Sequence, residues 1–110
     1  MIKVSVLFPN SESSKFDMDY YCNRHIPMLQ KKLGTACRRV AVEQGLSGAV
    51  PGSKPTFAAM GHLYFESVEA YQMAFTPHAA AIMGDIPNYT NVQPTIQVSA
   101  VKIQRTRTGP

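Results

Sequence analysis

The chain has few of the residues that mark disulfide-rich, zinc-binding or membrane-spanning proteins. It has two cysteines, Cys22 and Cys37, without CxxC spacing, so neither a disulfide framework nor a zinc site is indicated, and we expect buried free thiols. No apolar run approaches the roughly 20 residues that a membrane span requires, and the start, MIKVSVLFPN, lacks a small-residue cleavage site. We therefore expect a cytoplasmic protein with no membrane partner.

Charge is also scarce, and it is not arranged for binding nucleic acid. Charged residues make up 16% of the 110 residues and hydrophobic residues 45%, a balance typical of one folded globular domain. The net charge of +4 comes from lysines and arginines that are scattered and not interleaved with aromatic residues. We expect no nucleic-acid partner.

Three common catalytic motifs are missing. There is no Gly-x-Ser-x-Gly elbow and no cysteine–histidine spacing, which argues against hydrolysis through a nucleophile. Gly45, Gly48 and Gly52 lie in a Pro-containing linker without the Lys-Ser/Thr pair of a phosphate-binding loop. Phosphoryl transfer is therefore disfavoured as well.

The hydrophobic periodicity predicts six main elements. Alternating patterns predict strands, and spacings of three and four predict helices, with Asp17 and Ser67 as caps and Gly34 as a stop. The predicted strands are 2–8, 37–45, 56–66 and 95–103, and the predicted helices are about 18–33 and 68–75, followed by a helical piece at 79–84. This βαββαβ order predicts an α+β, ferredoxin-like fold, in which a four-stranded antiparallel sheet carries its helices on one face.

The other face of the predicted sheet is mixed in character. The positions that alternate toward the helices are apolar, whereas the opposite positions are both apolar and polar: Ser5, Leu7, Met60, His62, Tyr64, Gln97, Ser99, Val101 and Ile103. A second copy would bury the apolar part and enclose the polar part, so we favour a homodimer whose sheets face each other. The alternative is a monomer with a half-wetted sheet.

The stretch FDMDYYCNRHIP, residues 16–27, concentrates reactive side chains on the first helix. Tyr21 and His25 are four residues apart and share a face, within an apolar stripe that should bury His25 at least partly. Arg24 lies on the neighbouring flank, within reach of a carboxylate or phenolate. Pro27 removes a backbone donor and should kink the helix beside His25.

Two interpretations of His25 are open. A partly desolvated imidazole beside a tyrosine can shuttle protons, because imidazoles titrate near neutral pH, and this suits isomerisation, dehydration or enolisation. Alternatively, His25 only donates a hydrogen bond to the carbonyl of Asn23, which Pro27 leaves without its usual partner.

Two stretches of the chain resemble the EthD family. FDMDYYCNRHIPML is similar to the family pattern of an aromatic and Asp, one or two tyrosines and then His-x-Pro-Leu, with Met28 where leucine is more usual. DIPNYTNVQPTIQVSAV resembles the corresponding end of the family. With the element order, the resemblance covers Met1 to about Ile103. We place the domain at 1–104 and a flexible tail at 105–110.

The resemblance implies a fold and a set of partners. The family is named for a small protein of the ethyl tert-butyl ether degradation cluster, found alongside a cytochrome P450 system. It belongs to the dimeric α/β-barrel superfamily, in which two ferredoxin-like subunits pair their sheets. The implied partners are a second copy, a small hydrophobic organic ligand in a barrel cavity, and a cytochrome P450 system in xenobiotic catabolism.

The resemblance leaves the reaction open. Relatives in the superfamily include cofactor-independent monooxygenases, muconolactone-type isomerases and haem proteins, and fungal EthD-domain proteins are associated with dehydration or oxidation of polyketides. A fold alone does not choose among them. We expect no cofactor and no metal, although His62 could serve as the haem ligand known from barrel relatives; its plain alternative is a satisfied strand histidine.

These considerations give one set of candidate site residues. We expect His25 and Tyr21 to be catalytic, while Asp17 is interpreted as a helix cap and Asp85 as an organiser of its loop. The expected substrate-binding residues are Tyr20, Arg24, Met28, His62, Tyr64 and Gln97. Three functions remain open: an enzyme of proton transfer on a hydrophobic carbonyl or phenolic compound, a non-catalytic accessory or ligand-scavenging protein, and a structural dimer without a cavity.

Overall fold

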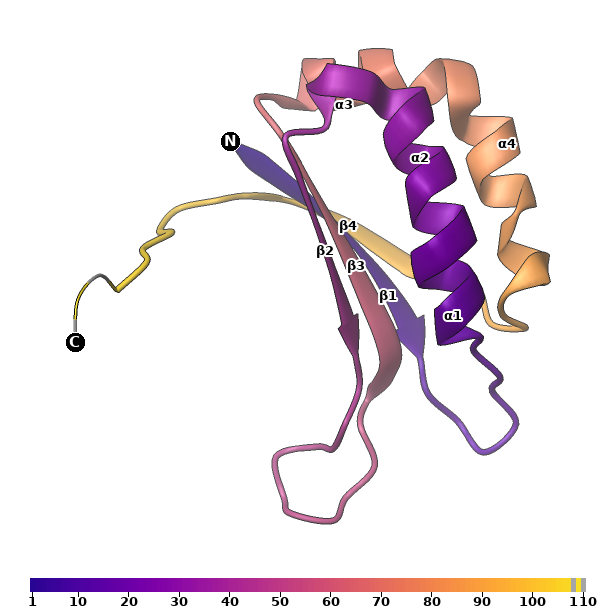
Figure 1. Cartoon of the computed structure of the whole chain (residues 1–110). Helices are drawn as coiled ribbons and strands as arrows, with labels where there is room; N and C mark the ends of the chain where they lie inside the picture. The colour runs from indigo at the N-terminus through magenta and orange to yellow at the C-terminus, as the bar shows by residue number, and fades with distance from the viewer. Residues whose placement is uncertain (108, 110) are drawn as a thin grey trace.

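Four antiparallel strands form one sheet in the order β2-β3-β1-β4, and all the helices lie on one of its faces (Figure 1). The structure is a computed structural model and describes residues 1–107 and 109. Its elements are β1 (Ile2–Pro9), α1 (Met18–Tyr20), η1 (Tyr21–His25), α2 (Ile26–Leu33), η2 (Gly34–Ala36), β2 (Arg39–Gln44), β3 (Phe57–Phe65), α3 (Val68–Phe75), η3 (Thr76–His78), α4 (Ala79–Gly84), η4 (Ile86–Asn88) and β4 (Thr95–Ala100). The predicted α+β, ferredoxin-like βαββαβ fold is confirmed.

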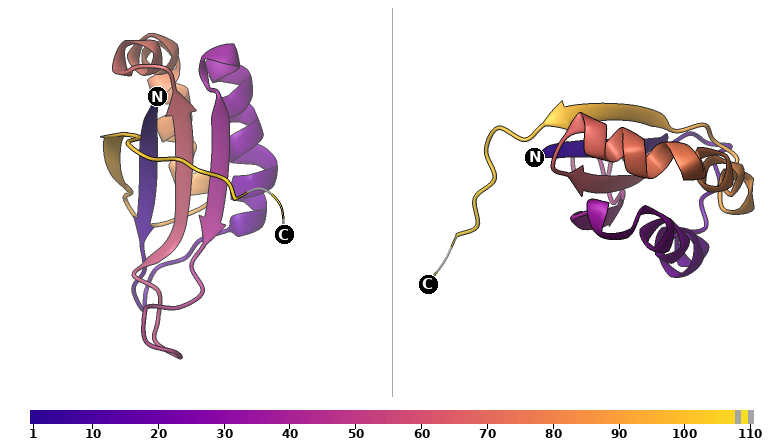
Figure 2. Two further views of the ribbon diagram at one scale, coloured as in Figure 1. Left: turned by 90° about the vertical axis from the view of Figure 1, so that its left-hand side faces the viewer. Right: turned by 90° about the horizontal axis from the view of Figure 1, so that it is seen from above.

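The strand register confirms the two predicted sets of sheet residues as far as Ala100, while Val101 and Ile103 lie beyond β4. Val4 pairs with Leu63 on β3 and with Val98 on β4, so these side chains share the face that carries the helices. Ser5 pairs with His62 and Gln97, which therefore lie on the opposite face. Strand β4 ends at Ala100 and is shorter than predicted, because the chain leaves the sheet there on the face without helices (Figures 1 and 2).

The predicted caps hold the helix ends. The carboxylate of Asp17 accepts a hydrogen bond from the backbone N–H of Tyr20 at 3.0 Å, and the hydroxyl of Ser67 accepts one from Ala70 at 3.1 Å. Gly34 ends α2 with φ of 63°, a conformation that glycine adopts without strain. The first helix and α3 therefore begin at the predicted caps, and α2 ends at the predicted glycine.

The core between the helices and the sheet consists of two clusters of buried residues. The first cluster contains Ile2, Val4, Leu29, Leu33, Leu63, Phe65 and Ile82, and the second contains Phe8, Tyr21, Ile26, Ala59, Ile86 and Tyr89. Both clusters draw on the first helix and on the central strands β1 and β3. The candidate catalytic helix thus spans the junction between them.

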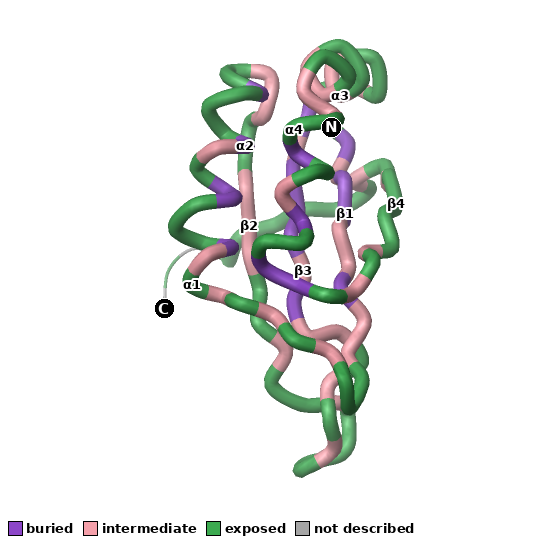
Figure 3. Tube along the Cα trace, turned by 90° about the vertical axis from the view of Figure 1, so that its right-hand side faces the viewer, coloured by how far each residue is buried: buried purple, intermediate pink, exposed green. Residues whose placement is uncertain are grey.

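Strand β4 is covered much less than its neighbours. The helices lie over β2, β3 and β1, while β4 extends to one side of α4 (Figure 3). Val98 is 42% exposed, although its partner Val4 on β1 is only 2% exposed. The prediction that β4 turns apolar residues toward the helical side is confirmed, but these residues are not buried in this chain.

Two further expectations can be checked against the fold. Both cysteines are free, but Cys22 is exposed and Cys37 half-buried, so the expected burial of the thiols was wrong. The first helix turns the side chain of Cys22 outward beside its buried neighbour Tyr21. Among the described residues, no helix is long and apolar enough to cross a membrane.

Candidate active site

The first helix widens into a π-helical turn at the residues with the candidate chemistry. The backbone N–H of Ile26 donates to the carbonyl of Tyr21, five residues earlier, where an α-helix would use the fourth. Pro27 follows directly and cannot donate to Asn23, and a wider turn relieves the crowding that its ring would cause. The predicted disturbance of the helix beside His25 is therefore a π-helical turn. Tyr21 and His25, at the two ends of this turn, are both buried, at 2% and 4% exposure.

His25 is bound to a carboxylate from the far end of the chain. Its Nδ1 lies 2.9 Å from Oδ2 of Asp85, which lies between α4 and η4. A carboxylate can only accept, so Nδ1 carries the proton and donates, and Nε2 is left with its lone pair. No described residue forms a hydrogen bond with Nε2. The alternative interpretation, a hydrogen bond from His25 to the carbonyl of Asn23, is therefore wrong.

Three donors hold Asp85 in place. Besides His25, the phenol of Tyr20 donates to Oδ1 at 2.8 Å, and the side-chain amide of Asn88 donates to the same oxygen at 2.9 Å. Burial alone would raise the pKa of Asp85, but the hydrogen bonds from Asn88, His25 and Tyr20 outweigh it and lower the pKa below the ordinary value. Asp85 is thus a carboxylate at neutral pH and can stabilise a positive charge on His25.

Aromatic rings enclose the imidazole of His25. The ring of Tyr21 stacks on it with centroids 5.4 Å apart and an angle of 12°, and the ring of Tyr89 lies 4.7 Å away. Burial raises the pKa of both Tyr21 and Tyr89 well above the ordinary value, so both phenols stay protonated and are hydrogen-bond donors. No described residue forms a hydrogen bond with either phenol oxygen, so both can donate to a ligand.

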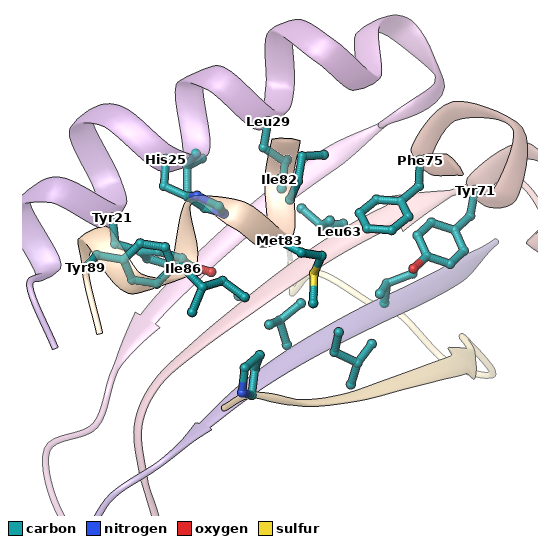
Figure 4. A pocket seen from close by; sticks show the side chains of 16 residues that line it. Tyr21, His25, Leu29, Leu63, Tyr71, Phe75, Ile82, Met83, Ile86 and Tyr89 are labelled. Carbon is teal, nitrogen blue, oxygen red and sulfur yellow. The ribbon is translucent and has the colours of Figure 1, made fainter. Parts of the chain in front are cut away.

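A small cavity lies between the helices and the sheet, at the junction of the two core clusters (Figure 4). It leaves about 40 Å³ in which the centre of a water molecule can move. Four side chains with polar atoms line it: Tyr21, His25, Tyr71 and Tyr89. The rest of its wall is Gly61 and apolar: Val4, Val6, Ile26, Leu29, Leu63, Phe75, Ile82, Met83, Ile86, Pro94 and Ile96. A cavity beside His25 contradicts the idea of a structural dimer without one.

The structure brings together three of the predicted site residues on the first helix. Tyr21 and His25 line the cavity, and Tyr20 is linked to His25 by a shared hydrogen-bond partner, Asp85. Arg24 is exposed on the helix surface, and Met28 packs against the first core cluster. Neither of these two side chains lines the cavity.

The other three predicted site residues lie on the opposite face of the sheet. Both ring nitrogens of His62 form hydrogen bonds. Nδ1 lies 2.9 Å from Ser5 Oγ, and Nε2 lies 3.1 Å from Glu43 Oε1. Tyr64 and Gln97 line a shallow hollow on the same open face. In one chain, the sheet therefore separates His62, Tyr64 and Gln97 from His25. The predicted site residues therefore do not all share one cavity within a chain.

The same contacts test whether the chain fits a haem. Haem ligation needs an imidazole nitrogen free for iron, but both nitrogens of His62 are engaged by Ser5 and Glu43. The cavity beside His25, at about 40 Å³, is far too small for a porphyrin. These residues do not fit a haem. Among the described residues, no group of three or more His, Cys, Asp or Glu side chains is arranged to hold a metal ion.

Sequence reasoning missed most of the partners of His25. Asp85 was interpreted only as an organiser of its loop, and Tyr89, Asn88 and Tyr71 were not proposed for the site. The available signal was DIPNY itself, the start of the second EthD-like stretch, which holds an acid, an amide and a phenol within five residues. Its position sixty residues from His25 concealed the contact.

Comparison with known proteins agrees with the two motifs that carry this site. A family model described as the EthD domain matches residues 10–93, a range that includes both the His25 helix and the Asp85 turn. The chain belongs to the EthD family. Among curated proteins, none matches the chain.

Two solved structures from the same family are similar to the chain. An EthD-like protein from Ralstonia eutropha JMP134 has 44% sequence identity and a TM-score of 0.91, over 96% of this chain and 95% of that one. An EthD family protein from Bacillus halodurans C-125 has 21% identity and a TM-score of 0.63, over 92% of this chain and 98% of that one. At this lower identity, the second likeness shows the fold alone.

Proposed function

We propose that this EthD family member is an enzyme of proton transfer, acting on a small hydrophobic carbonyl or phenolic compound with His25 as its base. The observation that supports it is the 2.9 Å hydrogen bond between His25 Nδ1 and Asp85. This bond fixes the tautomer in which Nε2 is the basic nitrogen, and the ring lies in the wall of an apolar cavity.

The side chains support a two-step reaction. His25 Nε2 removes a proton from a carbon next to a carbonyl, and the carboxylate of Asp85 stabilises the imidazolium that forms. The phenols of Tyr21 and Tyr89, held protonated by burial, donate to the enolate oxygen. His25 then returns the proton to another carbon, which is an isomerisation, or to a departing hydroxyl, which is a dehydration. General base catalysis of this kind contributes about 10²- to 10⁴-fold.

The experiment that tests this role measures proton exchange without a known substrate. A panel of hydrophobic β-diketones and enones is incubated with the protein in D₂O, and deuterium at the enolisable carbon is followed by NMR. We expect the wild type to accelerate exchange for part of the panel and His25→Gln to abolish the acceleration. His78→Gln, a half-buried histidine outside the cavity, is the matched control and should behave as wild type.

A second candidate is a non-catalytic accessory protein that binds a hydrophobic intermediate for a cytochrome P450 system. The mostly apolar cavity wall favours it. The two candidates differ in what His25→Gln does: ligand binding survives the change in an accessory protein, whereas exchange is lost in an enzyme. Ligand binding by wild type with no proton exchange across the panel would favour the accessory role. A cytoplasmic location suits both.

The same proposal includes a homodimer through the open face of the sheet. Leu7, Met60 and Tyr64 are half-buried on that face and surround the polar pair Ser5 and His62. We expect Leu7→Glu to convert a dimer to monomers in analytical ultracentrifugation, because it places a charge in the interface. Met73→Glu, at an exposed position of α3, is the control. A wild type that sediments as a monomer at micromolar concentration contradicts the dimer.

A further inference from the structure

The cavity beside His25 opens onto a strip of exposed apolar side chains. Met83 on α4 and Ile96 on β4 line the cavity, yet they are 39% and 43% exposed, so they form its rim. Val98 lies two residues beyond Ile96 on the same face of β4 and is 42% exposed. We call Met83, Ile96 and Val98 the rim strip. It continues from the cavity wall along β4, which the helices do not cover (Figure 3).

The size of the cavity shows that it accommodates only part of a typical ligand. Ligand pockets usually measure about 300–1,000 Å³, whereas this cavity measures about 40 Å³. A small head group fits beside His25, and the rest of a hydrophobic molecule would lie outside. The rim strip provides an apolar path from the cavity along β4. Met83 has a flexible side chain, which suits a rim that adjusts to what passes it.

From these observations, and resting on the proposed function, we propose that the substrate has two parts. A compact carbonyl or phenol head enters the cavity and reaches His25, and an apolar chain extends past Met83 and Ile96 onto Val98. From Ile96 to Val98, β4 covers about 7 Å, which corresponds to a short alkyl chain. The substrate class is therefore an amphipathic molecule that is longer than the cavity, with its reactive end innermost.

The test uses para-cresol, para-butylphenol and para-octylphenol as probes in isothermal titration calorimetry with the full chain. Each methylene that lies on one face of the rim strip should tighten binding by about twofold, roughly half the free energy of full burial. The gain should stop once the chain has passed Val98. Affinity that does not change with chain length would overturn the proposal.

Substitutions in the rim strip separate this inference from the proposed function. Val98→Ser, outside the cavity, should weaken para-butylphenol binding by about fivefold or more and leave para-cresol binding unchanged. Ile96→Ser should weaken para-butylphenol binding as well, but Ile96 also lines the cavity. Leu46→Ser, a fully exposed leucine in the β2–β3 loop, is the matched control and should change neither. If His25→Gln removes binding of all three probes but the strip variants have no effect, the inference fails while the proposed site stands.

A second copy of the chain is the competing occupant of the rim strip. In that case Ile96→Ser and Val98→Ser would lower the sedimentation coefficient of the free protein and leave the dependence on alkyl length unchanged. That combination overturns the proposal. Unchanged sedimentation with a lost length dependence supports it.

Discussion

The phenol oxygen of Tyr21 lies over the α-carbon of Gly61, in the space that a side chain at position 61 would occupy. Gly61 is buried on the helix-facing side of the central strand β3, where it pairs with Val6 on one side and Val42 on the other. Only a glycine leaves this space open. Tyr21 can take this position, and stack on His25, because residue 61 has no side chain.

We therefore expect Gly61→Ala to destabilise the protein by about 1–3 kcal/mol, the usual cost of overpacking a core. Urea denaturation measures this loss. Gly84→Ala is the matched control, because a Cβ there contacts nothing within 4 Å, and it should be neutral or slightly stabilising. Adding Tyr21→Phe to Gly61→Ala should recover part of the loss, since it removes the overlapping oxygen. Equal stability of the two glycine variants contradicts this account.

Asp85→Asn should release the tautomer of His25. An amide can either donate or accept, so Nδ1 is no longer forced to carry the proton. The ring ¹⁵N chemical shifts of His25 should change from one protonated nitrogen at Nδ1 to a mixture, and any proton exchange that the enzyme catalyses should fall by at least roughly 10²-fold. Asp19→Asn, at an exposed acid of the helix that carries His25, should leave both measurements unchanged. If the His25 spectrum is unaltered in Asp85→Asn, Asp85 does not set the tautomer of His25, and the proposed role of this pair is contradicted.

Asp85 should also affect how the free energy of unfolding falls at acid pH. Its pKa in the folded protein is lowered from the ordinary 3.8, so the native state binds this proton less readily than the unfolded state. The stabilisation is present above about pH 4 and is lost as the pH falls through the folded pKa. Urea denaturation at a series of acid pH values should therefore show a shallower decline for Asp85→Asn than for wild type. Asp19→Asn should decline in parallel with wild type.

The buried phenols should act at the opposite end of the pH scale. The pKa values of Tyr21 and Tyr89 are raised by burial, so the folded state keeps protons that the unfolded state releases. Their contribution is present below about pH 10, the ordinary tyrosine value, and is lost as the pH rises above it. Tyr21→Phe should reduce the alkaline loss of stability without altering the acid limb. Ultraviolet difference spectra that show all tyrosines ionising before unfolding would refute this.

The periodicity of the sequence predicted the sheet, both helices and their caps, because these depend on local spacing. The same periodicity placed His25 on a helix that faces the sheet and His62 on strand positions that face away. Taken together, these two predictions already separated the residues by the thickness of the sheet. The grouping of His25 and His62 in one site came instead from the resemblance to the family, which implies a barrel of two paired sheets with a ligand inside it.

Local spacing could not predict the contact between His25 and Asp85. The two residues come from opposite halves of the chain, and only the return of η4 beside the first helix joins them. Tyr89 follows in the same turn and closes over the imidazole. The sequence pattern also did not predict the wider turn at residues 21–25. Pro27 predicts a disturbed helix, but it does not predict which hydrogen bonds replace the usual ones.

That widened turn gives the helix one residue more than a regular α-helix would place between the same flanking segments. Its hydrogen bond over five residues takes up the extra residue locally, so the segments before and after the turn keep their directions. Pro27 lies beside it and offers no N–H for the ordinary bond. An extra residue accommodated in regular α-helical turns would instead rotate everything upstream by about 100°, and Tyr20 and Tyr21 would no longer meet the loop that completes the site.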